Sequence, residues 1–174
     1  ELRYQIAKKD LQYLGYKTTF DYLVDMAKLV LEETGLLPHL NPGTMTVEQI
    51  LQLREVAPSM GIMLESSSKR LCLKGQPHFG SPDKNPDLRL RTIRAAGKAL
   101  VPLTTGILIG IGETKQERIE SLLAIRKCHI EFNHIQEIII QNFIPKPDTK
   151  MRNTQAPELE ELLWTLAMAR IIFG

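Results

Sequence analysis

The segment 102-PLTTGILIGIGETKQER-118 joins an apolar, strand-like run to a helical pattern through three glycines: Gly106, Gly110 and Gly112. Glycine weakens a strand unless another group approaches the backbone closely or the backbone needs a positive φ. Thr114 and Glu117 have the spacing of a capping box, so a helix is expected directly after the glycines. The segment therefore predicts a strand–turn–helix unit whose turn lies against another part of the molecule or a ligand.

Outward from this segment, strand-like and helical patterns alternate along the whole chain. The predicted strands are 36–42, 60–65, 102–109 and 135–142, and the predicted helices are 18–33, 46–57, 86–97, 115–131 and 157–171. This alternation predicts one α/β domain with a parallel sheet and crossover helices. Because function sits at the carboxyl ends of such strands, the polar or glycine-containing ends at 41–43, 65–68, 110–114 and 141–143 predict a site.

The composition is that of a globular protein that buries a core. The 174 residues are 43% hydrophobic and 24% charged, with a net charge of +2. A net charge this small does not indicate binding to nucleic acid or to an anionic membrane. No apolar run is long enough to span a membrane. Two cysteines, Cys72 and Cys128, do not form a disulfide framework, so a reducing, cytoplasmic compartment is expected.

Three explanations of the glycine-rich strand end can be compared: a Rossmann fingerprint, simple packing, and a different known pattern. It lacks the G-x-G-x-x-G spacing of a Rossmann fold, and close packing of a helix on the sheet would also explain the glycines. The stretch 106-GILIGIGE-113 matches G-x-I-x-G-x-x-E, with Leu108 in the isoleucine position. In that pattern it resembles the fifth strand of radical S-adenosylmethionine (SAM) enzymes.

The resemblance implies a set of residues that contact SAM at the strand ends. The acidic or hydroxyl end of the preceding strand would be supplied by Glu65 and Ser66, and an arginine for the SAM carboxylate by Arg89, with Arg91 as its rival. In the glycine segment and the last strand, the implied contacts are Gly110, Gly112, Glu113, Asn142 and Phe143. Glu113 has two readings, since it either holds the turn or lies near the nucleoside.

Several longer sequence segments limit the resemblance to one family. These segments are 36-LLPHLNPG-43, 60-MGIMLES-66, 75-GQPHFGSPDKNP-86, 104-TTGILIGIGET-114 and 134-HIQEIIIQNF-143. Together they resemble the first subunit of 7,8-didemethyl-8-hydroxy-5-deazariboflavin (FO) synthase. The resemblance implies a radical SAM reaction that closes the deazaflavin ring of the coenzyme F-420 precursor. The implied substrate is an adduct of 5-amino-6-(D-ribitylamino)uracil and a tyrosine-derived fragment, and ammonia is lost.

The same resemblance implies cofactors, partners and substrate contacts. The cofactors would be a [4Fe-4S] cluster and SAM, and the partners would be the second synthase subunit and an electron donor such as ferredoxin or flavodoxin. Substrate contacts are expected from Thr104 and Thr105 on the fifth-strand segment, from His39 just before a strand end, and from His78 in the loop 75–80.

The chain departs from the family in lacking the Cys-x₃-Cys-x₂-Cys motif that holds the cluster. It also starts without methionine and stops at 168-MARIIFG-174, within a helical pattern. The expected fold is therefore a partial (βα)6-type TIM-like barrel, truncated at both ends, in which residues 1–174 form the central and C-terminal part of one radical SAM domain. This piece alone is expected to be inactive and to hold no metal. Two alternatives stay open: a related radical SAM enzyme (the second FO synthase subunit or an aminofutalosine synthase), and a cluster-free, non-catalytic barrel remnant.

Overall fold

The computed structural model describes residues 4–174 and confirms the α/β class. Its helices are α1 (Gln5–Tyr13), α2 (Thr19–Thr34), α3 (Val47–Arg54), α4 (Pro86–Lys98), α5 (Lys115–Phe132) and α6 (Leu159–Phe173). Its strands are β1 (His39–Leu40), β2 (Ser59–Gly61), β3 (Leu103–Ile109) and β4 (Ile135–Asn142), and two short 3₁₀ helices are η1 (Lys69–Cys72) and η2 (Pro82–Lys84).

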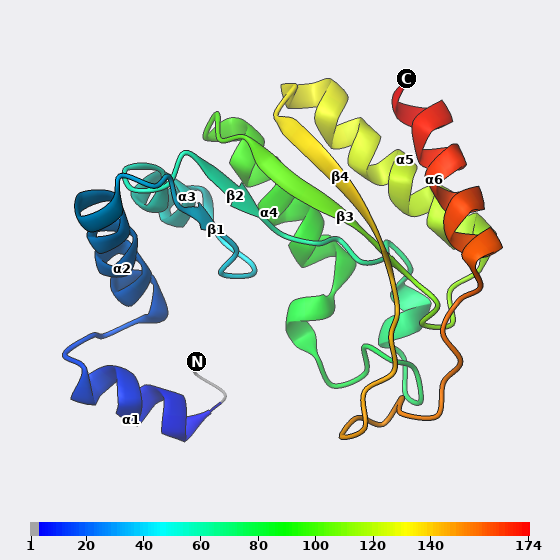
Figure 1. The fold of residues 1–174 in the computed structure, drawn as a ribbon, viewed down its shortest axis with the longest axis horizontal. Helices are drawn as coiled ribbons and strands as arrows, with labels where there is room; N and C mark the ends of the chain where they lie inside the picture. The colour runs from blue at the N-terminus through cyan, green and yellow to red at the C-terminus, as the bar shows by residue number, and fades with distance from the viewer. Residues whose placement is uncertain (1–3) are drawn as a thin grey trace.

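The four strands form one parallel sheet in the order β1-β2-β3-β4 (Figure 1). Leu103 pairs with Ile135 and Ile109 with Asn142, so β3 and β4 run side by side along their whole length. A register shift at Leu103/Thr104 marks a bulge at the start of β3. Because all three strand pairs are parallel, the four carboxyl ends lie on the same side of the sheet, which we call its carboxyl edge.

The predicted caps set the starts of the helices. Capping boxes open α2, α3 and α5 at Thr18, Thr46 and Thr114, each with its partner three residues later. Asn85 caps α4 and Pro86 occupies its first position, where no N–H is needed. Each cap accepts hydrogen bonds from backbone N–H groups at the start of the helix that would otherwise lack partners. Because the capping residues are close in sequence, these helix starts could be predicted from the sequence.

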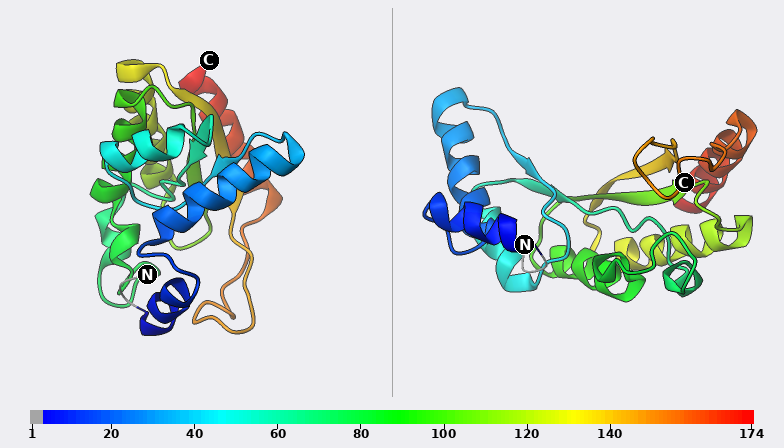
Figure 2. Two further views of the ribbon diagram at one scale, coloured as in Figure 1. Left: turned by 90° about the vertical axis from the view of Figure 1, so that its left-hand side faces the viewer. Right: turned by 90° about the horizontal axis from the view of Figure 1, so that it is seen from below.

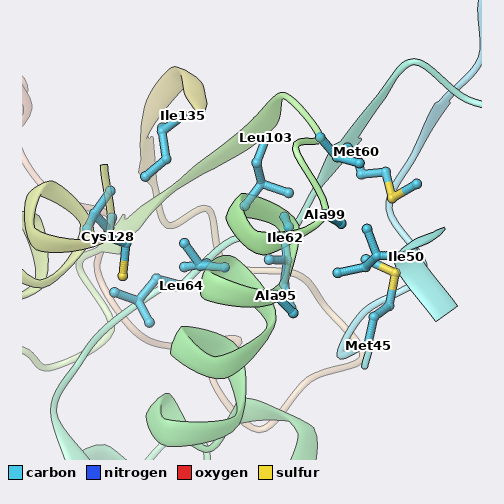
Figure 3. Packing of buried hydrophobic residues seen from close by; sticks show 14 of the residues in the cluster. Met45, Ile50, Met60, Ile62, Leu64, Ala95, Ala99, Leu103, Cys128 and Ile135 are labelled. Atoms are coloured by element: carbon cyan, nitrogen blue, oxygen red, sulfur yellow. The ribbon is translucent and has the colours of Figure 1, made fainter. Parts of the chain in front are cut away.

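Helices α4 and α5 cover the same face of the sheet, and α6 follows beside α5 (Figure 2). The core lies between these helices and the strands. In Figure 3, Ile62, Leu64 and Leu103 point from the sheet toward Ala95 on α4, while Cys128 enters from α5. Ile138 and Ile140 of β4 belong to the same core, where α6 residues such as Leu162 and Phe173 pack.

The opposite face of the sheet, which we call the open face, carries the alternate side chains of the strands. Since successive strand residues point to opposite faces, the residues adjacent to the core residues in each strand point away from the helices. The open face consists of His39, Asn41, Gly61, Met63, Thr104, Gly106, Leu108, Glu137, Ile139 and Gln141. None of the described helices covers the middle of this face in Figure 2.

The sequence-based prediction was wrong in some details. Helix α1 was not predicted, because none of its residues is buried and the pattern therefore lacks a core-facing stripe. Strand β1 is limited to two residues, and β2 ends at Gly61, beyond which only Glu65 bridges Ile107. Within residues 4–174, no helix has both the length and the apolar character needed to cross a membrane.

Candidate functional site

Loops that follow β2, β3 and β4 meet at the carboxyl edge of the sheet and enclose a pocket of about 560 Å³. The β2 loop contributes Gln76 and Phe79, the β3 turn contributes Ile111 and Gly112, and the loop after β4 contributes Met151. Lys74 and Lys150 also line it, so the pocket combines apolar walls with positive charge. Such a combination suits a planar ligand that carries polar or anionic groups.

Glu113 organises the turn between β3 and α5. Its carboxylate accepts hydrogen bonds from the backbone N–H groups of Gly110 and Ile111, at 2.8 and 2.9 Å. Arg118 donates to the same carboxylate at 2.7 Å, and the Glu113 side chain is 2% exposed. Of the two roles expected from sequence, the structure therefore shows the turn-holding one.

The three glycines serve different purposes. A Cβ at Gly106 would lie 2.0 Å from the Ile139 carbonyl oxygen on β4, so this glycine allows the two strands to approach. A Cβ at Gly110 would lie 2.6 Å from Pro157, so this glycine allows the loop before α6 to approach the turn. Gly112 has φ +102° with no atom within 4 Å of a Cβ position, and it lines the pocket, so it alone leaves open space for a ligand.

Glu65 ends the β2 segment with a left-handed backbone, φ 62°, and its side chain is 11% exposed. His78 Nε2 and Arg89 Nη1 lie 3.1 Å from its carboxylate oxygens, and Lys84 Nζ also pairs with it. Burial alone would raise the pKa of Glu65, but the hydrogen bonds from His78 and Lys84 and the charge of Arg89 lower it to about 2. The carboxylate is therefore ionised at neutral pH and already surrounded by donors.

Arg89 forms an ion pair with Glu65. Its guanidinium also donates to the carbonyl oxygens of Asp83, at 2.9 Å, and Met63. The sequence-based hypothesis assigned the SAM carboxylate to Arg89 and another polar group of SAM to Glu65. The structure joins the two side chains in one buried network. His78 belongs to this network too, since it is 6% exposed and its Nδ1 has no hydrogen-bond partner among the described residues.

Comparison with curated proteins gives matches along the whole chain. It is 54% identical over 175 aligned residues to FO synthase of Nocardia farcinica and 51% identical to that of Mycobacterium tuberculosis. It is 48% identical over 166 residues to 7,8-didemethyl-8-hydroxy-5-deazariboflavin synthase of Methanobrevibacter smithii. The chain is therefore similar to FO synthases along its whole length. It spans 20% of the length of the first two relatives and 49% of the third, and no protein-family model matches it.

Solved structures confirm the fold of this chain. HydG, a maturase of the [FeFe]-hydrogenase, superposes with a TM-score of 0.71 at 20% identity, covering 89% of this chain and 37% of HydG. Methylornithine synthase (PylB) gives 0.68 at 22% identity, covering 87% of this chain and 43% of PylB. At these identities the likeness concerns the fold alone, and it supports the expected TIM-like α/β barrel type.

The remaining residues predicted to contact SAM lie at or near the same edge of the sheet. Ser66 is 2% exposed, and its hydroxyl accepts from the backbone N–H of Ser68 at 3.1 Å, so it shapes the loop after β2. Asn142 and Phe143 line a second pocket, of about 390 Å³, with Leu108 and Gln141. The structure therefore brings the β3 and β4 ends together, as the sequence indicated.

The expected substrate contacts divide between the two faces of the sheet. Thr104 and His39 lie on the open face. Thr105 instead pairs with Ile138 on the helix-covered face, where it is fully buried and its hydroxyl has no partner among the described residues. The cause is the strand period of two, which sends adjacent threonines to opposite faces.

Sequence reasoning missed Lys84 and Arg70. Arg70 donates to the Gly112 carbonyl oxygen at 2.7 Å and to both carboxylate oxygens of Glu117, so it links η1 to the turn after β3. Arg70 lowers the pKa of Glu117 to about 2 by its hydrogen bond. Because these partners are more than forty positions apart, no local pattern could have revealed them.

The described residues do not fit an iron–sulfur cluster. Cys128 is fully buried on α5, and Cys72 Sγ lies 3.9 Å from the Lys84 carbonyl oxygen, with burial raising the pKa of both thiols. Among residues 4–174, no three His, Cys, Asp or Glu side chains gather in a way that could hold a metal ion. A cluster needs convergent thiolates, which these two cysteines do not provide.

Proposed function

We propose that the protein containing this chain is a radical SAM synthase that forms the deazaflavin ring of FO. The substrate would be an adduct of 5-amino-6-(D-ribitylamino)uracil and a tyrosine-derived fragment, and ammonia would be released. The observation that carries this proposal is the 48–54% identity to FO synthases along the chain. The radical SAM type of barrel and the pocket at its carboxyl edge support the same reaction class.

In this proposal the [4Fe-4S] cluster is held by residues outside the chain, and SAM lies at the carboxyl edge of the sheet. Bound SAM would supply a 5′-deoxyadenosyl radical. The open space at Gly112 and the apolar wall of Ile111 and Phe79 fit a flat nucleoside. Glu113 and Arg70 hold that turn in place, and the network of Glu65 and Arg89 fixes the neighbouring strand end.

The proposal includes partners and a place for the reaction. A second synthase subunit or domain would supply the adduct, an electron donor such as ferredoxin or flavodoxin would reduce the cluster, and the reaction would take place in the cytoplasm. In this scheme the 174 residues alone form no FO, because residues 4–174 bring together no group of side chains that could hold the cluster.

The test is reconstitution of the complete protein with iron, sulfide, SAM, a reductant and the second synthase activity. With tyrosine and 5-amino-6-(D-ribitylamino)uracil present, we expect FO to form, identified by mass and by its deazaflavin fluorescence. Formation of 5′-deoxyadenosine without FO, followed by turnover of a different substrate, would identify a related radical SAM enzyme instead. A complete protein that binds no cluster would overturn the proposal.

A further inference from the structure

A row of polar side chains crosses the open face of the sheet near the amino ends of the strands. Gly61 pairs with Thr104, and Thr104 pairs with Glu137, so neighbouring strands place these residues side by side. Asn41 extends the same row on the β1 side, next to Gly61. We call Asn41, Thr104 and Glu137, together with His39, the polar row.

Gly61 lets the imidazole of His39 lie over strand β2. A Cβ at Gly61 would come within 2.9 Å of His39 Nε2 and within 3.5 Å of Asn41 Nδ2. On its other side, His39 Nδ1 lies 2.8 Å from the Ser59 hydroxyl, which fixes the orientation of the ring. His39 Nε2 is thus held above the sheet in a defined position, with Asn41 beside it.

Thr104 and Glu137 continue the row on β3 and β4. The Thr104 hydroxyl donates to Glu137 Oε2 at 3.3 Å and accepts from Gln136 Nε2 at 3.2 Å. The bulge at Leu103/Thr104 makes this possible, because it brings two adjacent β4 residues to one threonine. Among the described residues Glu137 makes no ion pair, so its carboxylate keeps acceptor capacity.

The chemistry of the row suits a neutral, hydroxylated group. No lysine or arginine stands among the open-face strand residues, so the row does not match a phosphate or carboxylate. The row offers both hydrogen-bond donors and acceptors, from imidazole, amide, hydroxyl and carboxylate groups. Neighbouring strands place these groups roughly 4.8 Å apart. A flexible chain that carries several hydroxyl groups can meet one such group on each strand.

The position of the row also limits which part of a ligand it can bind. Gly61 lies four residues before Glu65, which corresponds to roughly 13 Å along a strand. A substrate that reacts at the carboxyl edge can therefore reach the row only with a remote, non-reacting part. Binding such a part helps to hold the reacting end in place.

We propose that the polar row is the binding site for the polyhydroxylated chain of the substrate. This inference rests on the proposed function, whose substrate carries a ribityl chain at one end. His39, Asn41, Thr104 and Glu137 exchange hydrogen bonds with its hydroxyl groups, and the heterocycle lies nearer the carboxyl edge. The row thereby selects ribityl-bearing substrates over analogues without the chain.

The experiment compares two probes by equilibrium dialysis against the complete, reconstituted synthase. One is 5-amino-6-(D-ribitylamino)uracil, and the other is 5-amino-6-(methylamino)uracil, which lacks the hydroxylated chain. We expect Thr104→Val to weaken binding of the ribityl probe about tenfold, the size of a lost hydrogen bond or two, and to leave the methyl probe unchanged. Glu137→Ala, at an exposed position, should give the same pattern if Thr104→Val fails to fold.

Thr105→Val is the matched control, because it removes the same hydroxyl from the adjacent residue on the helix-covered face. It should leave both affinities unchanged. An equal loss for both probes in Thr104→Val and Glu137→Ala, or no loss for either, would overturn the inference while FO formation by the wild type kept the proposed function intact. If the wild type made no FO and did not distinguish the probes, the proposed function would fail as well.

Discussion

At the carboxyl edge of the sheet, the single carboxylate of Glu65 interacts with three basic side chains. Its negative charge faces His78, Lys84 and Arg89, and its own backbone adopts a left-handed conformation. Removing the charge would leave the buried guanidinium of Arg89 without its counter-ion, which is costly in a site of low solvent access. We therefore expect this residue to control acid stability.

Glu65→Gln should destabilise the protein at pH 7 by about 3 kcal/mol, the equivalent of a pKa lowered from 4.5 to about 2. Because the folded pKa lies below the unfolded one, this stabilisation is present above pH 4.5 and is lost as the pH falls toward 2. The measurement is urea unfolding of wild type and variant between pH 7 and 2.5. Their free energies of unfolding should converge at low pH.

Glu120→Gln provides the control for that series, since Glu120 is exposed on α5. It should change the free energy of unfolding by no more than about 0.5 kcal/mol at any of these pH values. The acid dependence that Glu117 contributes is common to all three proteins and cancels in the differences. A constant gap between wild type and Glu65→Gln down to pH 2.5 would contradict the assigned network.

The glycines of 106–112 show what a sequence pattern can and cannot reveal about single residues. The motif correctly indicated close approach and a turn at this strand end. It did not distinguish Gly106, which faces the β4 backbone, from Gly110, which faces Pro157, because both partners are distant in the chain. The same limit applies to Arg89, whose partner Glu65 could be assigned only when the fold was known.

At the scale of elements, local signals predicted the helices well. The capping boxes at Thr18, Thr46 and Thr114 act within four residues, so they set helix starts independently of the fold. Strand β4 matches its predicted range, whereas β2 is shorter, because its length depends on which residues β3 can pair. The face of each strand was the least predictable feature, as the opposite orientations of Thr104 and Thr105 show.

Arg118 joins three elements through one buried side chain. From α5 it donates to Glu113 in the turn after β3, to Glu161 on α6 at 2.7 Å, and to Thr165 at 3.2 Å. Arg118→Ala would leave the carboxylate of Glu113 buried without its cation. We expect a loss of roughly 3–5 kcal/mol in the free energy of unfolding, the usual cost of breaking a buried pair.

The Arg118→Ala variant should also show faster hydrogen exchange in α6, because the helix loses a direct link to α5. Arg126→Ala, an exposed change on the same helix, should alter stability by less than about 0.5 kcal/mol and leave exchange in α6 unchanged. Equal effects of the two substitutions would contradict a linking role for Arg118. Both are measured by denaturant unfolding and by exchange mass spectrometry.

At the scale of the whole molecule, the strand β4 lies at one side of the sheet, and apolar side chains are exposed beside it. β4 is eight residues long and pairs on one side only, with β3, among the described strands. On α6, which packs beside it, Leu159, Leu163 and Ile171 are 67%, 55% and 74% exposed. An unpaired strand edge next to exposed leucines favours association with another chain.

We therefore expect the 174-residue chain, expressed alone, to associate as its concentration rises. Analytical ultracentrifugation should show a shift from monomer to larger species in the micromolar range. The double variant Leu163→Glu and Ile171→Glu should reduce this association, because it places charge on the exposed side of α6, while Lys127→Glu on α5 should not. A wild-type chain that stays monomeric at all concentrations would mean that the β4 edge and α6 are protected in a way that the exposed residues do not indicate.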